Sequence, residues 1–208
     1  MTIPKERPIL LSPPMVRATL EDRKTMTRRV IDQPVSVLHS NGTAHSPMVK
    51  RRGDWYKPNE WSPYGRPGEL LWVREGGWID RAEHRFFVYA ATPNVAQVCD
   101  GGFVETHTKP DAAFLKRQGY LRCPSIHMPR WASRLTLRIT DVRVERLQEI
   151  SAEDCIAEGL WSTLREHDAV CDLRNQYRVL WNMLNAKRGH PWKSNPWVWV
   201  LSYERVIA

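Results

Sequence analysis

The chain has 208 residues, 42% of them hydrophobic, which is the size and composition of a globular protein with one sizeable core or two small ones. Its 31 Lys and Arg residues exceed its 23 Asp and Glu residues, and the resulting net charge of +8 attracts polyanions over long distances. Neither a run of about 18 apolar residues nor an apolar signal-peptide core is present, so we expect a cytoplasmic protein with no membrane partner.

The cysteines do not predict a metal site or a disulfide framework. Four are present, and none forms a close pair: Cys99, Cys123, Cys155 and Cys171. A mixed zinc site with His107 or His127 is an alternative, but no typical spacing of zinc ligands supports it. We therefore expect no metal, no cofactor, and thiols that are buried or idle.

The N-terminal segment predicts a strand, a short helix and a second strand. Residues 8–11 form a short apolar run typical of a strand. Ser12 before Pro13 is typical of a helix N-cap with proline at the first helical position, and the helix is expected to continue through Leu20. Residues 24–30 then form a run with β-branched residues and a period of two, which indicates a strand.

Two long segments have the composition of loops. Residues 33–67 contain five prolines among polar and glycine residues, and residues 92–130 show no regular pattern apart from one helical turn at about 111–118. Between them, residues 69–75 and 85–89 are predicted strands. Long loops in compact domains are usually functional or disordered, so both segments could shape a binding site.

The C-terminal third predicts a long strand, two helices and a closing strand. The long strand begins at Arg134, and its alternation slips at residues 140–141, which suggests a bulge. A short helix over about 152–158 ends before Gly159, and a longer helix with one apolar face follows. The run 197–203 is apolar on both faces and predicts a buried strand.

These elements predict an α+β fold in a single domain over residues 1–208. We expect a small β-barrel flanked by helices, with the two loop segments as insertions, because no linker and no internal repeat divides the chain.

The segment 23–29 surrounds two hydroxyl groups with four cations at the predicted junction of helix and strand. The cations are Arg23, Lys24, Arg28 and Arg29. Arginines hold phosphate oxygens in a bidentate manner and lysine adds a point charge, so one interpretation is a phosphate-binding edge. In a second interpretation, Lys24 is crowded by like charges, loses its proton more easily, and takes the proton of a hydroxyl nucleophile, for which Thr27 is the candidate.

The geometry needed for that chemistry is restrictive. Residues three apart on a flat strand point to opposite faces, so only a turn or helix end at residues 24–26 would bring Lys24 and Thr27 together. Glu158 is a third candidate, because a carboxylate in the last turn of a helix faces the negative end of the helix dipole. Functional sites tolerate such a position more often than structural ones do, although a solvated glutamate is the alternative.

Aromatic residues provide a second line of evidence. The chain has ten Trp residues, and aromatic faces are stacking platforms for unpaired bases. Trp72 and Trp131 lie beside arginines in the sequence and are the two that we expect near a ligand. The full set of expected nucleic-acid-binding residues is Arg23, Arg28, Arg29, Trp72, Arg74, Glu75, Arg130, Trp131 and Arg134.

Taken in order, these segments resemble the ASCH-type, PUA-like proteins common in phages and prophages. The segments that carry the resemblance are residues 8–11 with 15–18, 23–29, 68–75, 128–134 and 195–200. The resemblance covers most of the chain and is specific as a set. It implies a small β-barrel whose helices flank a cleft, in a superfamily associated with RNA modification.

The segment around Lys24 is also similar, more distantly, to the small bacterial N(4)-acetylcytidine amidohydrolases. That resemblance assigns a catalytic lysine to Lys24, a catalytic threonine to Thr27 and a catalytic glutamate to Glu158. It implies that Thr27 attacks the acyl carbonyl, that Lys24 is its base, and that Glu158 orients or protonates. The chain departs from those enzymes at Asp22, where they have glycine, and in its two long insertions.

Three functions therefore remain open. The first is hydrolysis of an acylated cytidine nucleoside or RNA, and the second is metal-independent cleavage of RNA. The third is a non-catalytic module that binds RNA, a modified nucleotide or single-stranded nucleic acid. We expect a monomer that takes RNA or a modified nucleoside or nucleotide as its partner.

Overall fold

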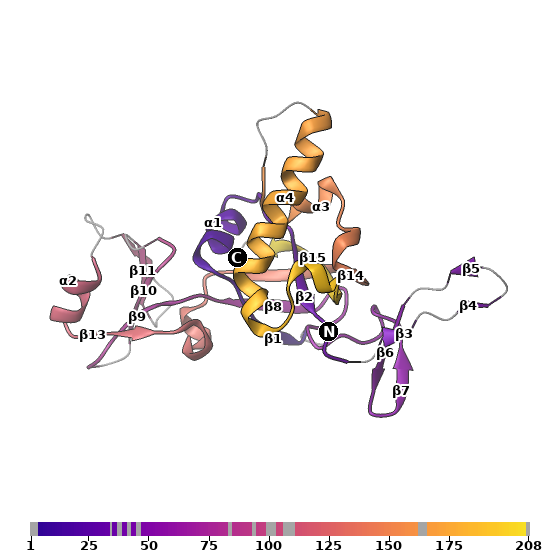
Figure 1. The fold of residues 1–208 in the computed structure, drawn as a ribbon. Helices are drawn as coiled ribbons and strands as arrows, with labels where there is room; N and C mark the ends of the chain where they lie inside the picture. The colour runs from indigo at the N-terminus through magenta and orange to yellow at the C-terminus, as the bar shows by residue number, and fades with distance from the viewer. Residues whose placement is uncertain are drawn as a thin grey trace. The chain divides into compact units, whose positions relative to one another are not determined.

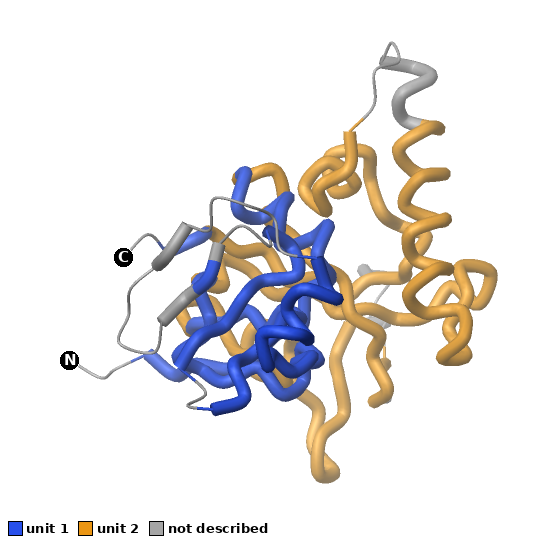
Figure 2. The backbone as a smooth tube through the Cα atoms, turned by 90° about the vertical axis from the view of Figure 1, so that its left-hand side faces the viewer, with its two compact units in different colours: residues 1–21, 70–137, 205–208 blue, residues 22–69, 138–204 orange. Residues whose placement is uncertain are grey.

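The chain folds into a mixed α+β structure, and Figure 1 labels its helices and strands. This computed structural model describes residues 4–33, 35–36, 39–40, 43–44, 47–82, 85–92, 95–98, 103–105, 111–161 and 166–206. The chain divides into two compact units, which Figure 2 shows in different colours. Unit 1 contains residues 1–21, 70–137 and 205–208, and unit 2 contains residues 22–69 and 138–204.

Unit 1 consists of a parallel strand pair, two short helices and an antiparallel sheet. Its elements are β1 (Glu6–Leu10), α1 (Pro13–Leu20), β8 (Leu70–Arg74), β9 (Gly77–Asp80), β10 (Phe86–Tyr89), β11 (Val95–Val98), β12 (Phe103–Glu105), α2 (Ala112–Arg117), β13 (Tyr120–Cys123) and the 3-10 turns η1 (Ser125–His127) and η2 (Arg130–Ala132). β1 pairs with β8 in parallel, and the antiparallel sheet has the strand order β12-β11-β10-β9-β13. Phe87 and Tyr89 of β10 pack against Met128 and Ala132 to form one core of this unit.

Unit 2 contains the two longest strands and the longest helix among the described residues. Its elements are β2 (Met26–Val30), β3 (Val35–Ser36), β4 (His39–Ser40), β5 (Thr43–Ala44), β6 (Met48–Arg51), β7 (Asp54–Tyr56), most of β14 (Thr136–Arg146), η3 (Leu147–Glu149), α3 (Ala152–Ala157), α4 (Glu166–Asn185), η4 (Ala186–Arg188), η5 (Trp192–Ser194) and most of β15 (Trp197–Val206). The strands run in the orders β14-β15-β2, β3-β6-β7 and β4-β5. The residues that position the candidate site lie on the first of these sheets and on the helices α3 and α4.

The core of unit 2 joins α4 to this sheet. Tyr177 and Trp181 lie on the apolar stripe of α4 and pack with Val198 and Val200 of β15 and with Met26 of β2. All five are less than 9% exposed. The predicted apolar face of the long helix and the predicted buried closing strand are therefore confirmed.

The two loop predictions are wrong in part. Residues 33–67 include the β6–β7 hairpin, whose turn residues Arg52 and Gly53 have φ of 50° and 101°. Positive φ at both turn positions suits the twist of a tight hairpin. The hairpin was not predicted because such turns usually have asparagine or glycine at the first position, where this chain has Arg52. Residues 92–130 include β11, β12 and β13, which are too short to show a period-two pattern.

No sheet in the described part of the chain closes into a barrel. The α+β class is therefore observed, whereas the PUA-like barrel and the single domain over residues 1–208 stay predictions. None of the helices in the described ranges combines the length and the apolar character that a membrane-spanning helix needs.

Candidate functional site

Main-chain hydrogen bonds hold the segment before β2 between the end of α3 and strand β15. The Thr25 amide donates to the Ala157 carbonyl at 2.8 Å, and the Tyr203 amide donates to the Thr25 carbonyl at 2.9 Å. Lys24 pairs with Glu158 as an isolated antiparallel bridge just outside β2. The side chain of Lys24 is therefore directed by this bridge and not by the regular alternation of a strand.

Lys24 and Glu158 form a buried ion pair, although 134 residues separate them in the sequence. The Lys24 Nζ lies 2.5 Å from Glu158 Oε2, and the two side chains are 0% and 2% exposed. The same Nζ donates to the main-chain carbonyls of Met26 at 2.7 Å and Glu158 at 3.0 Å. An ammonium group has three hydrogens, so all of them are used within the protein.

Burial lowers the pKa of Lys24, and the neighbouring carboxylate of Glu158 offsets only part of this effect. The nearby guanidinium groups of Arg28 and Arg29 lower the pKa further by charge repulsion. The neutral amine, which is the form that can accept a proton, is therefore more accessible for Lys24 than for a lysine in water.

The end of α3 sets the position of Glu158. Gly159 follows with φ of 94°, its amide donates to the Ile156 carbonyl at 2.8 Å, and the Leu160 amide donates to the Cys155 carbonyl at 3.1 Å. These two bonds define a Schellman motif, which needs a left-handed residue directly after the helix cap. Glu158 is that cap residue, so the helix end aims it toward Lys24.

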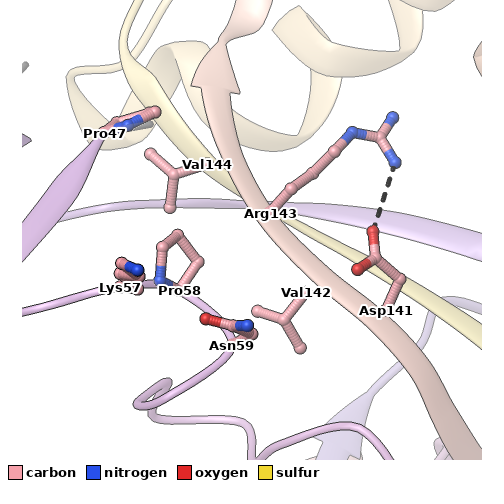
Figure 3. Close-up of a pocket in the computed structure, with 8 residues that line it drawn as sticks. All are labelled: Pro47, Lys57, Pro58, Asn59, Asp141, Val142, Arg143 and Val144. Atoms are coloured by element: carbon pink, nitrogen blue, oxygen red, sulfur yellow. Dashed lines mark ion pairs between the residues drawn. The ribbon is translucent and has the colours of Figure 1, made fainter. Parts of the chain in front are cut away.

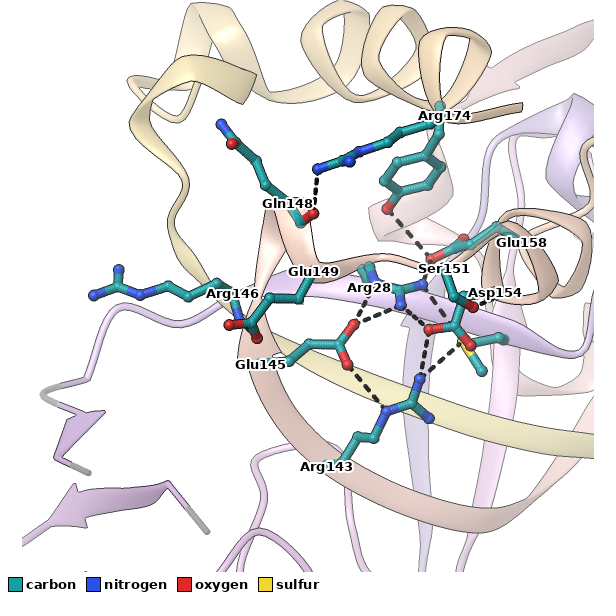
Figure 4. A network of polar contacts seen from close by, with 12 residues as sticks. Arg28, Arg143, Glu145, Arg146, Gln148, Glu149, Ser151, Asp154, Glu158 and Arg174 are labelled. Carbon is teal, nitrogen blue, oxygen red and sulfur yellow. Dashed lines mark hydrogen bonds and ion pairs between the residues drawn. The ribbon is translucent and has the colours of Figure 1, made fainter. Parts of the chain in front are cut away.

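A network of guanidinium and carboxylate groups extends from Glu158 (Figure 4). Arg28 Nη2 lies 2.6 Å from Glu145 Oε1 and also pairs with the Asp154 carboxylate, while Nη1 lies 3.5 Å from Glu158 Oε1. Arg143 pairs with the same two partners, at 3.1 Å from Glu145 Oε2 and 2.7 Å from Asp154 Oδ2. Strands β2 and β14 thus contribute facing arginines that share carboxylates.

The network carries no excess of positive charge, and a further anion, Asp141, lies 3.9 Å from Arg143. Its cations are Lys24, Arg28 and Arg143, and its anions are Glu145, Asp154 and Glu158. Burial works against the Arg28 cation, but the carboxylates of Glu158 and Glu145 outweigh burial and raise the pKa of Arg28. Arg28 therefore stays charged, and Lys24 is the member of the network whose proton can be moved.

Tyr177 closes the network on the side of α4. Its hydroxyl donates to Glu158 Oε1 at 3.3 Å, and the Arg28 guanidinium lies 5.9 Å from its ring centroid. Burial, reinforced by the Glu158 carboxylate, raises the pKa of Tyr177 well above its usual value. Tyr177 is thus a permanent neutral donor to one oxygen of Glu158, while Lys24 holds the other.

Thr27 does not join this cluster. It is 1% exposed and lies opposite Leu201 in the pairing of β2 with β15. Side chains alternate along a strand, so Thr27 points to the opposite face of β2 from Arg28. Within the described part of the chain, the Lys24 amine bonds to Met26 and Glu158 and not to the Thr27 hydroxyl. The structure therefore brings together two of the three predicted catalytic residues.

The three arginines of this segment have different surroundings. Arg28 is 4% exposed and its guanidinium is engaged by the protein's own carboxylates. Arg29 is half-buried, and Arg23 is exposed and donates to the Gly159 carbonyl at 3.2 Å. Of the three predicted phosphate contacts, Arg23 is therefore the best placed to reach a solvent-borne anion, and contact of nucleic acid with any of the three stays a prediction.

In unit 1, the structure brings two of the predicted binding residues, Arg74 and Arg130, over the ring of a third, Trp72. The ring of Trp72 is 8% exposed, and the guanidinium carbons of Arg74 and Arg130 lie 4.6 Å and 5.7 Å from its centroid. Arg130 also donates to Glu6 at 2.9 Å and 3.2 Å. Trp72 is therefore covered by cations in this structure, which leaves the arginines and not the indole at the surface.

The other predicted residues of unit 1 form a second buried pair. Arg134 donates to both carboxylate oxygens of Glu75, at 2.8 Å and 3.0 Å, and lies 3.8 Å from the ring centroid of Tyr89. Glu75 is 1% exposed, and burial raises the pKa of its carboxyl against the opposing effect of Arg134. Trp131 is half-buried against the core of this unit. The Glu75–Arg134 pair holds neighbouring segments of unit 1 together.

Sequence reasoning missed four members of the network in unit 2. Arg143 and Glu145 lie two residues apart on β14, so their shared face was a usable signal. Asp154 was visible only as part of a helix cap, and Tyr177 only as part of an apolar stripe. A hydrophobicity pattern counts Tyr177 as an aromatic residue and does not show what its hydroxyl group contacts.

The cysteines and histidines add no site in the described ranges, where no group of three or more His, Cys, Asp or Glu residues could hold a metal ion. Cys123 and Cys155 are buried and Cys171 is exposed, all with free thiols. Cys99 and His107 lie outside the described residues.

Comparison with protein-family models, with curated proteins and with solved structures found no match for this chain.

Proposed function

We propose that this chain is a nucleic-acid- or nucleotide-directed hydrolase of the ASCH, PUA-like kind, which removes an acyl group from the exocyclic nitrogen of cytidine, free or within RNA. The observation that carries the proposal is the Lys24–Glu158 pair. The resemblance predicts that these two residues act together, and their side chains lie 2.5 Å apart across 134 residues of sequence. A buried lysine with a lowered pKa and a specific charge partner is typical of functional sites.

In the proposed reaction, the Thr27 hydroxyl oxygen attacks the acyl carbonyl carbon and the neutral Lys24 amine takes the hydroxyl proton. Glu158 holds Lys24 in place, and the proton passes to the cytidine nitrogen as the carbon–nitrogen bond breaks. Water then hydrolyses the acyl ester and restores Thr27. Lys24 must exchange a contact in this structure, such as that to the Met26 carbonyl, for the Thr27 hydroxyl; catalytic hydrogen bonds often tighten only when substrate is bound.

The test is turnover of N(4)-acetylcytidine, followed by chromatography, for the wild type and for Thr27→Val. Valine keeps the shape of threonine and removes only the nucleophile, so we expect Thr27→Val to lose turnover. Because the base must be neutral, the wild-type rate should rise with pH, with a midpoint below the usual lysine value of 10.5. Thr19→Val is the matched control, since Thr19 is equally buried but bonds to Met15 in α1. Equal turnover by Thr27→Val and wild type would remove Thr27 from the mechanism.

A non-catalytic binding module is the second candidate, and the position of Thr27 favours it. The Lys24 ammonium is saturated by three acceptors and Thr27 points to the opposite face of β2, as expected if the pair only holds the fold. This candidate predicts no product in the same assay. It predicts instead that single-stranded RNA binds with strong salt dependence and less tightly to Arg23→Gln. Cleavage of that RNA without divalent ions would support a ribonuclease.

A further inference from the structure

Unit 2 has a second candidate binding site, a cavity between β14 and the turn that follows β7 (Figure 3). Its volume is about 420 Å³, which lies in the range of small-molecule sites in proteins. The residues that line it are Pro47, Lys57, Pro58, Asn59, Asp141, Val142, Arg143 and Val144.

The lining of this cavity is mixed, with polar and apolar side chains contributing similar surface, and its apolar members come from β14 and from the prolines. Figure 3 shows Val142 and Val144 pointing from β14 toward the turn that carries Pro58 and Asn59. Both valines are at most 6% exposed, and Pro58 is buried. Valine and proline side chains are rigid, so a ring that packs against the small apolar surface they leave open costs little side-chain freedom.

The polar groups at the cavity are of two kinds. Arg143 and Asp141 line the cavity at its β14 edge, but their side chains point away from Val142 and Val144 and their charged groups lie 3.9 Å apart. Lys57 and Asn59 are exposed at the rim, and within the described residues neither side chain has a hydrogen bond or an ion pair. An amide offers one donor and one acceptor side by side, and an ammonium group offers a positive charge.

We propose that this cavity binds a nucleoside phosphate, with the base between the valine and proline walls, its polar edge on the Asn59 amide, and its phosphate on the Lys57 ammonium. An amide side chain reads a base edge through paired hydrogen bonds, and lysine is a phosphate-binding residue. The site goes beyond the proposed hydrolase function, since its lining does not include Lys24, Thr27 or Glu158, although it shares Arg143 with the network. The ligand is either a free nucleotide or one unit of an RNA strand, which share this chemistry.

The experiment measures equilibrium binding by calorimetry with cytidine 5′-monophosphate, cytidine and a short oligocytidylate. None of these carries an acyl group, so the result does not depend on turnover at Lys24. We expect Lys57→Met to weaken the binding of cytidine monophosphate by about 10-fold or more and to leave the binding of cytidine unchanged, because the substitution removes only the charge. Asn59→Leu, which keeps the approximate shape of the side chain but removes the amide, should weaken the binding of all three ligands.

Lys50→Met is the matched control, because Lys50 is an exposed lysine of the same unit that lies 5.7 Å from the Trp55 ring and does not line the cavity. It should bind as the wild type does. Binding of the oligonucleotide alone, lost in Lys57→Met, identifies RNA as the source of the phosphate. The proposal is overturned if none of the three ligands binds, or if wild type, Lys57→Met and Asn59→Leu bind equally well.

Discussion

The buried ammonium group of Lys24 is bonded to three protein acceptors instead of water. These bonds determine both the free-energy cost of burying the charge and the chemistry that the amine can perform. A charge removed from water loses several kcal/mol of hydration, and only a well-placed partner and complete hydrogen bonding recover that loss. The Glu158 carboxylate and the two main-chain carbonyls provide both. The partial compensation is visible in the lowered pKa of Lys24. The residue is therefore held as a cation in the resting protein, with a proton that is easier to remove than usual.

Breaking one side of this pair should cost more stability than removing both sides. We expect Lys24→Met to lower the free energy of unfolding by about 3–5 kcal/mol, because it leaves a buried carboxylate without its cation. Lys24→Met combined with Glu158→Gln should be less destabilised than Lys24→Met alone. Denaturant unfolding of the three proteins measures both differences.

The matched control for this prediction is the exposed pair Arg138–Glu204, whose side chains are 51% and 56% exposed at 3.0 Å. Arg138→Met should cost less than about 1 kcal/mol, since water screens an exposed pair. A Lys24→Met variant as stable as Arg138→Met would show that Glu158 finds another partner or takes up a proton without cost.

Among the helices and strands, the short helix α3 has the most consequence for the site. Its N-cap Ser151 accepts a hydrogen bond from the Asp154 amide at 3.1 Å, and its C-terminus ends in a Schellman motif at Gly159. The helix therefore begins and ends at fixed residues, and two of its carboxylates, Asp154 and Glu158, enter the network. Both ends were predictable from sequence, because serine caps and left-handed glycines have local signatures.

The sequence was less informative wherever structure depends on distant partners. The apolar stripe of α4 and the buried run of β15 follow from periodicity alone and are confirmed. Of the site, the closeness of Lys24 and Glu158 was predictable only through the resemblance, because the bridge between them joins segments 134 residues apart. The burial of Arg28 was not predictable, since its carboxylate partners come from β14 and α3.

Gly159→Ala tests whether the helix end positions Glu158. Alanine in a left-handed conformation costs about 1–2 kcal/mol, so the variant should be destabilised by that amount and should also lose turnover as the cap shifts. Gly119→Ala is the matched control, because Gly119 follows α2 in unit 1 with φ of 83°. Thermal unfolding and the acetylcytidine assay are measured on both. Similar destabilisation with unchanged turnover in both variants would contradict a role for the cap in catalysis.

Across the whole molecule, the charge that attracts polyanions is not the charge at the candidate site. The network of unit 2 has no net positive charge, so the net charge of +8 is carried by residues outside it. Exposed cations such as Arg23 and Lys57 can steer a nucleic acid toward unit 2, while the buried pair is reserved for chemistry or for stability. Different residues would therefore attract the nucleic acid and carry out the reaction. Substitutions at the two sets of residues can test the two roles separately.

The most direct test of the account is deacetylation of N(4)-acetylcytidine by the wild type and by Lys24→Arg, with the fold of both verified by near-ultraviolet circular dichroism. Arginine keeps the positive charge beside Glu158 but cannot give up its proton in a protein, so it preserves the ion pair and removes the base. We expect the wild type to release cytidine and the folded Lys24→Arg variant to be slower by about 100-fold or more. Equal rates for the two proteins, or no product from the wild type, would contradict this expectation.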